Sequence, residues 1–335
     1  MADVPTFVDI LAARERIAGE AVRTPLLRSP ILSERLKARV FLKPECLQRT
    51  GSFKFRGAWN AIQALGPTAR EQGVLAESSG NHAQGVAEAA RLVGARATIV
   101  MPNDAPELKR RRTERSGGRI VAFDRATEDR DAVFARVVEE LGGAVVHPFN
   151  DPFVIAGQGT VGLEIAEDCA ALGITPEIVV VPCSGGGLTA GVTLAIAERF
   201  PAARLYSAEP EGFDDYARSL KSGKREGNAR RTGSICDALL VPEPGPVGWE
   251  INRKRLAGGL VASDAEALFA VGLCFDEARL VVEPGGAVGL AALLAGRLEV
   301  QGRTVVIVLS GGNIGDEMLA EGVRVYRSSA GSRSR

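Results

Sequence analysis

The sequence predicts an α/β fold built on mostly parallel sheets, with helices covering both faces. Short runs of β-branched residues alternate along the chain with longer segments of helical pattern. The predicted strands are continuously apolar, which is typical of strands buried on both faces of a parallel sheet. At 335 residues the chain is longer than one core usually supports, so one large or two medium domains are expected.

The elements follow from these patterns in chain order. Strands are predicted at 40–45, 74–79, 97–102, 118–123, 177–182, 204–209, 280–284 and 304–310. Helices are predicted at 83–95, 187–200, 264–278 and 286–296. Parallel sheets bind ligands at the carboxyl ends of their strands, so functional residues are expected in the turns that follow the strands.

The composition excludes several classes of protein. The 41 basic residues balance the 41 acidic ones, which disfavours nucleic acid or an anionic membrane as partner, and the basic run at 108–115 is predicted to be a solvated helix face. Neither a signal peptide nor a membrane-spanning run is expected. Five scattered cysteines and two histidines disfavour a disulfide framework or a zinc site and fit a reducing cytoplasm.

A glycine-rich turn follows the strand predicted at 177–182. Ser184, Gly185, Gly186 and Gly187 lead directly into a helix, and exposed amides at a helix start make a cradle for a phosphate. A plain tight turn is the alternative, but three glycines exceed what turning requires. The G-x-G-x-x-G match at 157–162 follows no buried strand, so we interpret it as the start of a helix and not as a dinucleotide site.

Two further strand ends carry polar residues. Ser78, Ser79, Asn81 and His82 crowd one turn before a helix, which suits a carboxylate ligand, whereas an ordinary N-cap would need only one of them. Ser310 leaves a very apolar strand ahead of two glycines, where a plain turn is an equal interpretation.

One lysine stands between two phenylalanines in RTGSFKFRGA, at position 54, although only seven of the 41 basic residues are lysines. Apolar surroundings lower the pKa of a lysine and make its free amine a nucleophile or base. A snorkelling lysine is the alternative. Lys43 also lies among apolar residues, and the sequence does not separate the two.

Together these four motifs resemble the pyridoxal-phosphate enzymes whose fold includes the tryptophan synthase β-subunit, and within them the serine/threonine dehydratase and serine racemase branch. The resemblance runs from about residue 26 to residue 326. It implies a two-domain fold: a large domain of residues 1–72 and 148–326 that binds pyridoxal phosphate, and a small mobile domain of residues 73–147. Residues 327–335 are expected to be a disordered tail.

The resemblance also assigns roles. Lys54 would form the Schiff base, and Phe53 would pack near the cofactor ring. Asn81 would bond the ring's phenolic oxygen, and Ser310 would face its nitrogen. The cofactor phosphate would lie on Ser184, Gly185, Gly186, Gly187 and Leu188. The substrate carboxylate would lie on Ser78, Ser79, Gly80, Asn81 and His82.

The implied activity is β-elimination from a β-hydroxy amino acid such as L-threonine or L-serine, which gives a 2-keto acid and ammonia. Ser79 matches the acid/base serine of the racemases, so serine racemase stays an alternative, as does a dehydratase for 3-hydroxyaspartate or phenylserine. Glu209, Phe213 and Asp215 match a Mg²⁺ or Ca²⁺ site of the branch, with a solvated acidic loop as the alternative. A homodimer in the cytoplasm is expected. A dinucleotide oxidoreductase and a catalytically silent binding protein remain the rival classes.

Overall fold

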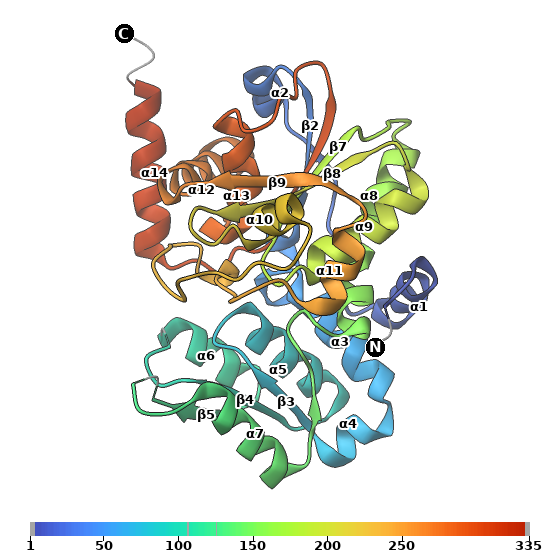
Figure 1. Cartoon of the computed structure of the whole chain (residues 1–335), viewed down its shortest axis with the longest axis vertical. Helices are drawn as coiled ribbons and strands as arrows, with labels where there is room; N and C mark the ends of the chain where they lie inside the picture. The colour runs from blue at the N-terminus through green and yellow to red at the C-terminus, as the bar shows by residue number, and fades with distance from the viewer. Residues whose placement is uncertain (1–3, 106, 125, 332–335) are drawn as a thin grey trace.

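The computed structural model describes residues 4–105, 107–124 and 126–331. They form two sheets of almost wholly parallel strands, each covered by helices (Figure 1). This arrangement confirms the α/β fold predicted from the apolar strands. Within the described residues, no helix is both long enough and apolar enough to cross a membrane.

The larger sheet has the strand order β1-β2-β10-β7-β8-β9, and only β1 pairs antiparallel to its neighbour. Its strands are β1 (Leu27–Arg28), β2 (Arg39–Pro44), β7 (Ile178–Pro182), β8 (Arg204–Pro210), β9 (Leu256–Ala262) and β10 (Thr304–Leu309). The helices that accompany it are α1 (Phe7–Ile17), α2 (Pro30–Leu36), α8 (Pro152–Ala171), α9 (Gly187–Arg199), α10 (Asp215–Ser222), α11 (Pro246–Asn252), α12 (Asp264–Ala278), α13 (Pro284–Leu294) and α14 (Asp316–Gly331). Short 3₁₀ turns lie at Glu45–Leu47, Arg49–Gly51 and Asp237–Leu239.

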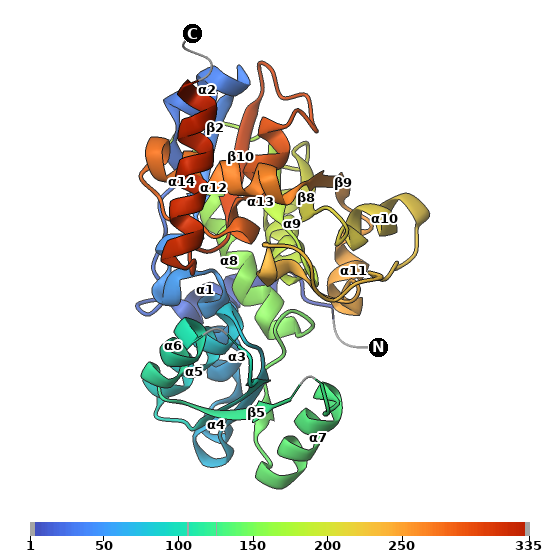
Figure 2. The ribbon, with the colours of Figure 1, turned by 90° about the vertical axis from the view of Figure 1, so that its left-hand side faces the viewer.

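The smaller sheet has the order β5-β4-β3-β6, with all pairings parallel. Its strands are β3 (Val74–Glu77), β4 (Ala97–Pro102), β5 (Gly118–Phe123) and β6 (Ala144–Val145). The helices beside it are α3 (Lys54–Leu65), α4 (Pro67–Gln72), α5 (Asn81–Val93), α6 (Glu107–Arg115) and α7 (Arg130–Leu141). Figures 1 and 2 show this layer at one end of the molecule and the larger sheet with α12, α13 and α14 at the other.

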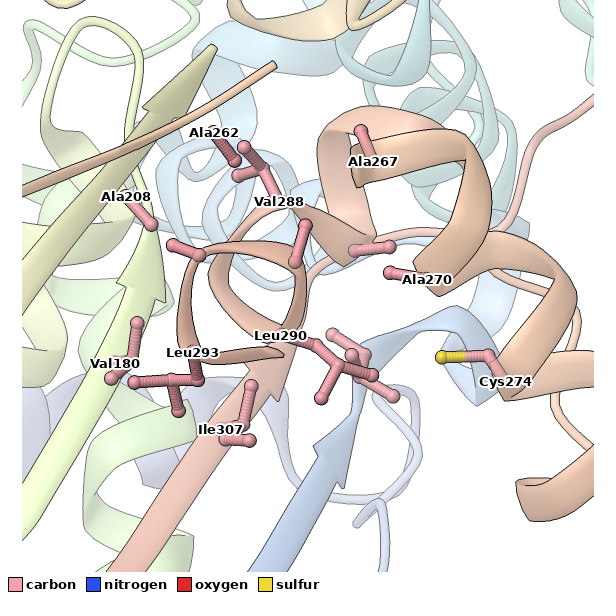
Figure 3. Close-up of a cluster of buried hydrophobic side chains, with 14 of the residues drawn as sticks. Val180, Ala208, Ala262, Ala267, Ala270, Cys274, Val288, Leu290, Leu293 and Ile307 are labelled. Carbon is pink, nitrogen blue, oxygen red and sulfur yellow. The ribbon is translucent and has the colours of Figure 1, made fainter. Parts of the chain in front are cut away.

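The main core lies around α13, which packs between the larger sheet and α12 (Figure 3). Side chains such as Leu290 and Leu293 contact sheet residues that include Val180 and Ile307, and all four are almost wholly buried. Burial of such aliphatic side chains contributes roughly 1.5–3 kcal/mol each. The core thus holds fixed the strand ends from which the candidate functional residues project.

Most of the predicted strands are confirmed, and one is wrong. The run 280–284 forms no strand, because Glu283 caps α13 and Pro284 is its first residue. Strand β9 was missed because Gly258 and Gly259 interrupt its apolar run. Helix α14 continues to Gly331, so residues 327–331 are helical although a disordered tail was expected there; residues 332–335 lie outside the described part of the chain.

The glycines at 157–162 are helical, as predicted, but they lie inside α8 and do not start it, because the helix begins at Pro152 after the N-cap Asp151. They allow close helix packing: a Cβ on Gly157 would lie 2.7 Å from the carbonyl oxygen of Arg56, and one on Gly162 would lie 2.8 Å from Cα of Val192. Real Cβ atoms do not approach so closely. The glycines therefore allow α8 to pack closely against α3 and α9. This contact helps to position Lys54, which is the first residue of α3.

Candidate functional site

Lys54 lies where elements of both sheets meet. The backbone N–H of Phe53 donates to the carbonyl of Ser310 (3.1 Å), which places the start of α3 at the end of β10. The Lys54 amine donates to the backbone carbonyl of Pro148 (2.8 Å) and lies 5.2 Å from the ring centre of Phe53. Burial lowers the pKa of Lys54 to about 8, an effect that the charge of Glu283 opposes. A fraction of the amine is therefore unprotonated near neutral pH.

Lys43 is the second lysine whose apolar neighbours suggested a reactive amine. In the structure it belongs to a buried ionic network. Its amine donates to Glu164 and to the carbonyl of Thr24, both at 2.6 Å. Arg56 completes the network through bidentate contacts with Glu45 and further bonds to Glu164. All of these groups are buried, so Lys43 and Arg56 serve structure. Lys54 is the lysine whose amine meets only a neutral carbonyl and is available for chemistry.

The turn of residues 78–82 joins β3 to α5 and faces the larger sheet. Ser78 accepts a hydrogen bond from the backbone of Gly80 (3.2 Å), and Asn81 is the first residue of α5. The side chain of Asn81 donates to Glu283 (2.6 Å) and accepts from Asn313 (2.7 Å). Asn81 is therefore held by residues of the other sheet's loops, beside the end of β10.

His82 is buried beneath this turn. Its Nε2 donates to the carbonyl of Val146 (2.8 Å), and its Nδ1 has no partner among the described residues. Burial, aided by the charge of Lys54, lowers the pKa of His82 to about 3. The imidazole is thus neutral at physiological pH and supports the turn, while the hydroxyls of Ser78 and Ser79 are half-buried.

The glycine loop after β7 is packed so closely that side chains cannot replace its glycines. Gly186 has φ of +88°, and a Cβ there would overlap the hydroxyl of Tyr216; a Cβ on Gly185 would overlap the ring of Phe149. Asn252 supports the loop by donating to the carbonyl of Gly186 (3.2 Å). The hydroxyl of Ser184 is buried without a partner among the described residues. Since a buried hydroxyl normally has a hydrogen-bond partner, this one fits a phosphate oxygen placed in the loop.

Glu283 is a site residue that the sequence reasoning missed. It caps α13, is buried, and lies so close to Gly311 that a Cβ on that glycine would overlap its carboxyl oxygen. Burial, aided by the charge of Asp237, raises the pKa of Glu283 to about 7. The sequence does contain a signal for a helix start here, because Glu283 is followed directly by Pro284. The apolar residues before Glu283 favour a strand instead, and the strand prediction hid this signal.

Ser310 follows β10 and is also buried, and Gly311 pairs with Ser52 in an isolated antiparallel bridge. The strand end of β10 thus contacts the segment that carries Lys54. Leu188 is buried in the first turn of α9 and packs in the core behind the glycine loop.

The residues proposed for a cation, Glu209, Phe213 and Asp215, lie where the end of β8 leads into α10. The two oxygens of Glu209 accept backbone N–H groups of Tyr216 (2.9 Å) and Ala217 (2.8 Å). One oxygen of Asp215 accepts from Asn228 (2.7 Å), and the other is buried without a partner in the described chain. Burial and mutual repulsion raise the pKa of Glu209, and burial raises that of Asp215 to about 7. Among the described residues, no group of three or more His, Cys, Asp or Glu side chains is arranged to hold a metal ion.

Comparisons with known proteins agree with this geometry. The L-threonine ammonia-lyase of Thermotoga maritima is 40% identical over 314 residues, which cover 94% of this chain and 77% of that protein. The L-threo-3-hydroxyaspartate ammonia-lyase of Saccharomyces cerevisiae is 39% identical over 311 residues, or 93% and 94% of the two chains. The solved structure of maize serine racemase superposes with a TM-score of 0.89 at 36% identity and covers 98% of this chain and 100% of its own.

The family model described as pyridoxal-phosphate dependent enzyme matches residues 17–311. This span contains three of the four motifs from which the resemblance was drawn and the start of the fourth, which runs on past residue 311; in the structure the segment of Lys54, the turn of Asn81 and the end of β10 lie together. The chain belongs to the family of pyridoxal-phosphate-dependent enzymes.

Proposed function

We propose that the protein is a pyridoxal-phosphate-dependent ammonia-lyase that converts a β-hydroxy amino acid into a 2-keto acid and ammonia. The observation that carries this proposal is the buried amine of Lys54, with a pKa of about 8, at the meeting point of the β3–α5 turn and the end of β10. Two relatives at about 40% identity are ammonia-lyases, one for L-threonine and one for L-threo-3-hydroxyaspartate, which supports this reaction class.

The residues present fit the cofactor. The unpartnered Ser184 hydroxyl and the glycines from Gly185 to Gly187 would hold its phosphate, with Leu188 behind them. Asn81 would bond its phenolic oxygen, Phe53 would lie beside its ring, and Ser310 would face its nitrogen. When bound, pyridoxal phosphate supplies an electron sink that stabilises negative charge at the substrate Cα.

The chain's own residues would then bind the substrate and move its protons. The hydroxyls of Ser78 and Ser79, with the backbone N–H groups from Gly80 to His82 at the start of α5, would bind the substrate carboxylate. Lys54, once its amine is free, would remove the proton from Cα as general base, for which a pKa near 8 is well matched to neutral pH. Ser310 is a neutral hydroxyl and, facing the ring nitrogen, would not hold it protonated, which would suit elimination better than transamination.

Serine racemase is the second candidate, and Ser79 is the observation that favours it. Its half-buried hydroxyl lies in the turn beside Asn81, where a racemase needs an acid/base on the side opposite Lys54. The structural similarity to maize serine racemase supports the same reading.

Ammonia and keto-acid release from L-threonine, L-serine, 3-hydroxyaspartate and phenylserine, with D-serine followed alongside, tests the proposal. Release from at least one substrate, lost in Lys54→Ala, supports the lyase and names its substrate. Accumulation of D-serine without ammonia, abolished by Ser79→Ala, would move the assignment to the racemase.

We propose a small domain built on residues 73–147 that closes over the substrate against a large domain of residues 1–72 and 148–326. All strands of the smaller sheet fall within residues 73–147. Helix α3 also packs into its core through residues such as Phe55 and Trp59, so the small domain's core extends back to this helix.

We also propose a homodimer working in the cytoplasm and a divalent cation, Mg²⁺ or Ca²⁺, on Glu209, Asp215 and the Phe213 carbonyl. The dimer rests on the family resemblance, and the compartment on five unpaired cysteines, four of them buried. The unpartnered oxygen of Asp215 and the raised pKa values of both carboxyl groups support the cation, since a hard cation would hold these groups ionised.

A further inference from the structure

A line of four hydrogen-bonded side chains connects the surface helix α6 to the cofactor site. Arg112 donates to Oδ1 of Asn313 (2.7 Å), and Nδ2 of Asn313 donates to Oδ1 of Asn81 (2.7 Å). Nδ2 of Asn81 then donates to Glu283 (2.6 Å). The line crosses three times between the two bodies of the molecule, one built on the smaller sheet and one on the larger, because Arg112 and Asn81 come from helices beside the smaller sheet and Asn313 and Glu283 from loops of the larger one.

In this line every hydrogen bond is donated in the same direction, from Arg112 toward Glu283. A guanidinium can only donate hydrogen bonds, so it requires the carbonyl oxygen of the Asn313 side chain on its side. The NH₂ group of Asn313 then faces Asn81 and also donates to the backbone carbonyl of Thr50 (2.8 Å). Asn81 must accept through its own oxygen, and its NH₂ group is left for Glu283 and for any acceptor placed beside it.

The Asn313 side chain lies against the turn of Thr50 and Gly51, both of which have a positive φ. Thr50 and Gly51 have φ of +66° and +75°, and a Cβ on Gly51 would lie 2.7 Å from the Asn313 side-chain oxygen. This turn immediately precedes Ser52, Phe53 and Lys54. The Asn313 amide therefore contacts both the segment that carries the reactive lysine and the residue proposed to bind the cofactor oxygen.

Arg112 differs from its neighbours on α6. Arg111 is largely exposed (75% of its side chain) and, among the described residues, pairs with Glu107 of its own helix, whereas Arg112 is half-buried against the other body. Lys109 makes a second contact of this kind, an ion pair with Asp237. Most of the basic run at 108–115 is thus a solvated helix face, as predicted; Lys109 and Arg112 reach across to the other body, and Thr113 is buried.

We propose that Arg112 is a positioning residue for the cofactor: through Asn313 it fixes the carboxamide of Asn81 in the orientation that binds pyridoxal phosphate. The inference rests on the proposed role of Asn81 and adds to it a residue that touches neither cofactor nor substrate. It also makes the position of α6, and hence of the small domain, part of the cofactor site.

The test measures the dissociation constant of pyridoxal phosphate, by dialysing the holoenzyme against graded cofactor concentrations, and the visible absorbance bands of the bound imine. Arg112→Met keeps the apolar stem and removes the donor. We expect it to raise the dissociation constant about threefold to tenfold, the worth of one hydrogen bond, and to change the ratio of the imine bands, which report on hydrogen bonding to the phenolic oxygen. Arg112→Lys should recover part of both effects. Arg111→Met, which removes the same charge from the same helix, should change neither.

Two further variants show which claim fails if the result differs. Arg112→Met should have no added effect in an Asn313→Ala background, because the proposed route runs through Asn313. An equal effect in both backgrounds, or a result for Arg112→Met that matches Arg111→Met, would overturn the inference. Asn81→Ala tests the underlying assignment: unchanged cofactor binding in this variant would refute the role of Asn81 itself, whereas weakened binding beside a silent Arg112→Met would refute only the role of Arg112.

Discussion

The buried carboxyl of Glu283 makes the stability of the cofactor-free protein depend on pH, and Glu283→Gln should remove that dependence. Burial raises the pKa of Glu283 from the ordinary 4.5 to about 7, because its ionised form loses solvation and faces the charge of Asp237. The native state therefore binds a proton that the unfolded chain releases between these two pH values.

The sign and size of the effect follow from this difference. Since the native state binds more protons, the stability contributed by Glu283 is fully present below pH 4.5 and is lost as the pH rises through 7. At about 1.36 kcal/mol for each pKa unit, the loss amounts to about 3 kcal/mol at pH 8. Glutamine keeps an oxygen that can accept from Asn81 but carries no charge.

Urea unfolding of both proteins at pH 5 and pH 8 measures the effect. The two proteins should unfold at similar urea concentrations at pH 5, and the Glu283→Gln variant should be the more stable at pH 8. Glu177→Gln is the control of opposite sign, because Arg303 holds the pKa of exposed Glu177 below its usual value, so this variant should be destabilised at pH 8. If the wild type and Glu283→Gln keep the same stability difference at both pH values, the reasoning about Glu283 is refuted.

Three other predictions concern the scaffold, the phosphate loop and the cation. Arg56→Met should lower the free energy of unfolding by about 3–5 kcal/mol, because it leaves the buried carboxylate of Glu45 without its cation and Glu164 with Lys43 alone, whereas Arg49→Met, whose ion pairs are partly exposed, should cost less than about 1 kcal/mol; equal costs in urea unfolding would contradict this. Gly186→Ala should abolish the visible imine absorbance, whereas Gly212→Ala, at φ of +80° with open space around it, should retain it; retention in both variants would argue against the cradle. Mg²⁺ or Ca²⁺ should raise the Tm of the wild type but not of Asp215→Asn, and a wild type that does not respond to either ion would count against the site.

Much of the fold could be predicted because the buried strands carry their own signal. Strands such as β7 and β10 are uninterrupted apolar runs, and both were predicted within a residue of their bounds. Strand β9 was missed because its glycines lie on a sheet edge against α10, where a Cβ on Gly259 would lie 2.6 Å from Ala217. The need for glycine there comes from a contact distant in sequence, which no local pattern records.

The candidate site was predictable where one short segment carries the chemistry. Lys54 and the glycine loop each lie within a single motif, and the motif order matched a known family. Glu283, Asn313 and Arg112 were not predicted, because their significance lies in contacts between residues about 200 positions apart. Lys43 illustrates the same limit: its local sequence did not separate it from Lys54, and only the family resemblance favoured Lys54 before the structure placed Glu164 beside the Lys43 amine.

The most direct test of the central claim is to reduce the holoenzyme with sodium borohydride and map the pyridoxyl adduct by mass spectrometry of its peptides. Reduction fixes the cofactor to the lysine that holds it as an imine. The geometry of the site predicts the adduct on Lys54, with no adduct on Lys43, whose amine is committed to Glu164 and the Thr24 carbonyl. An adduct on Lys43, or a holoenzyme in which no lysine is modified, would contradict it.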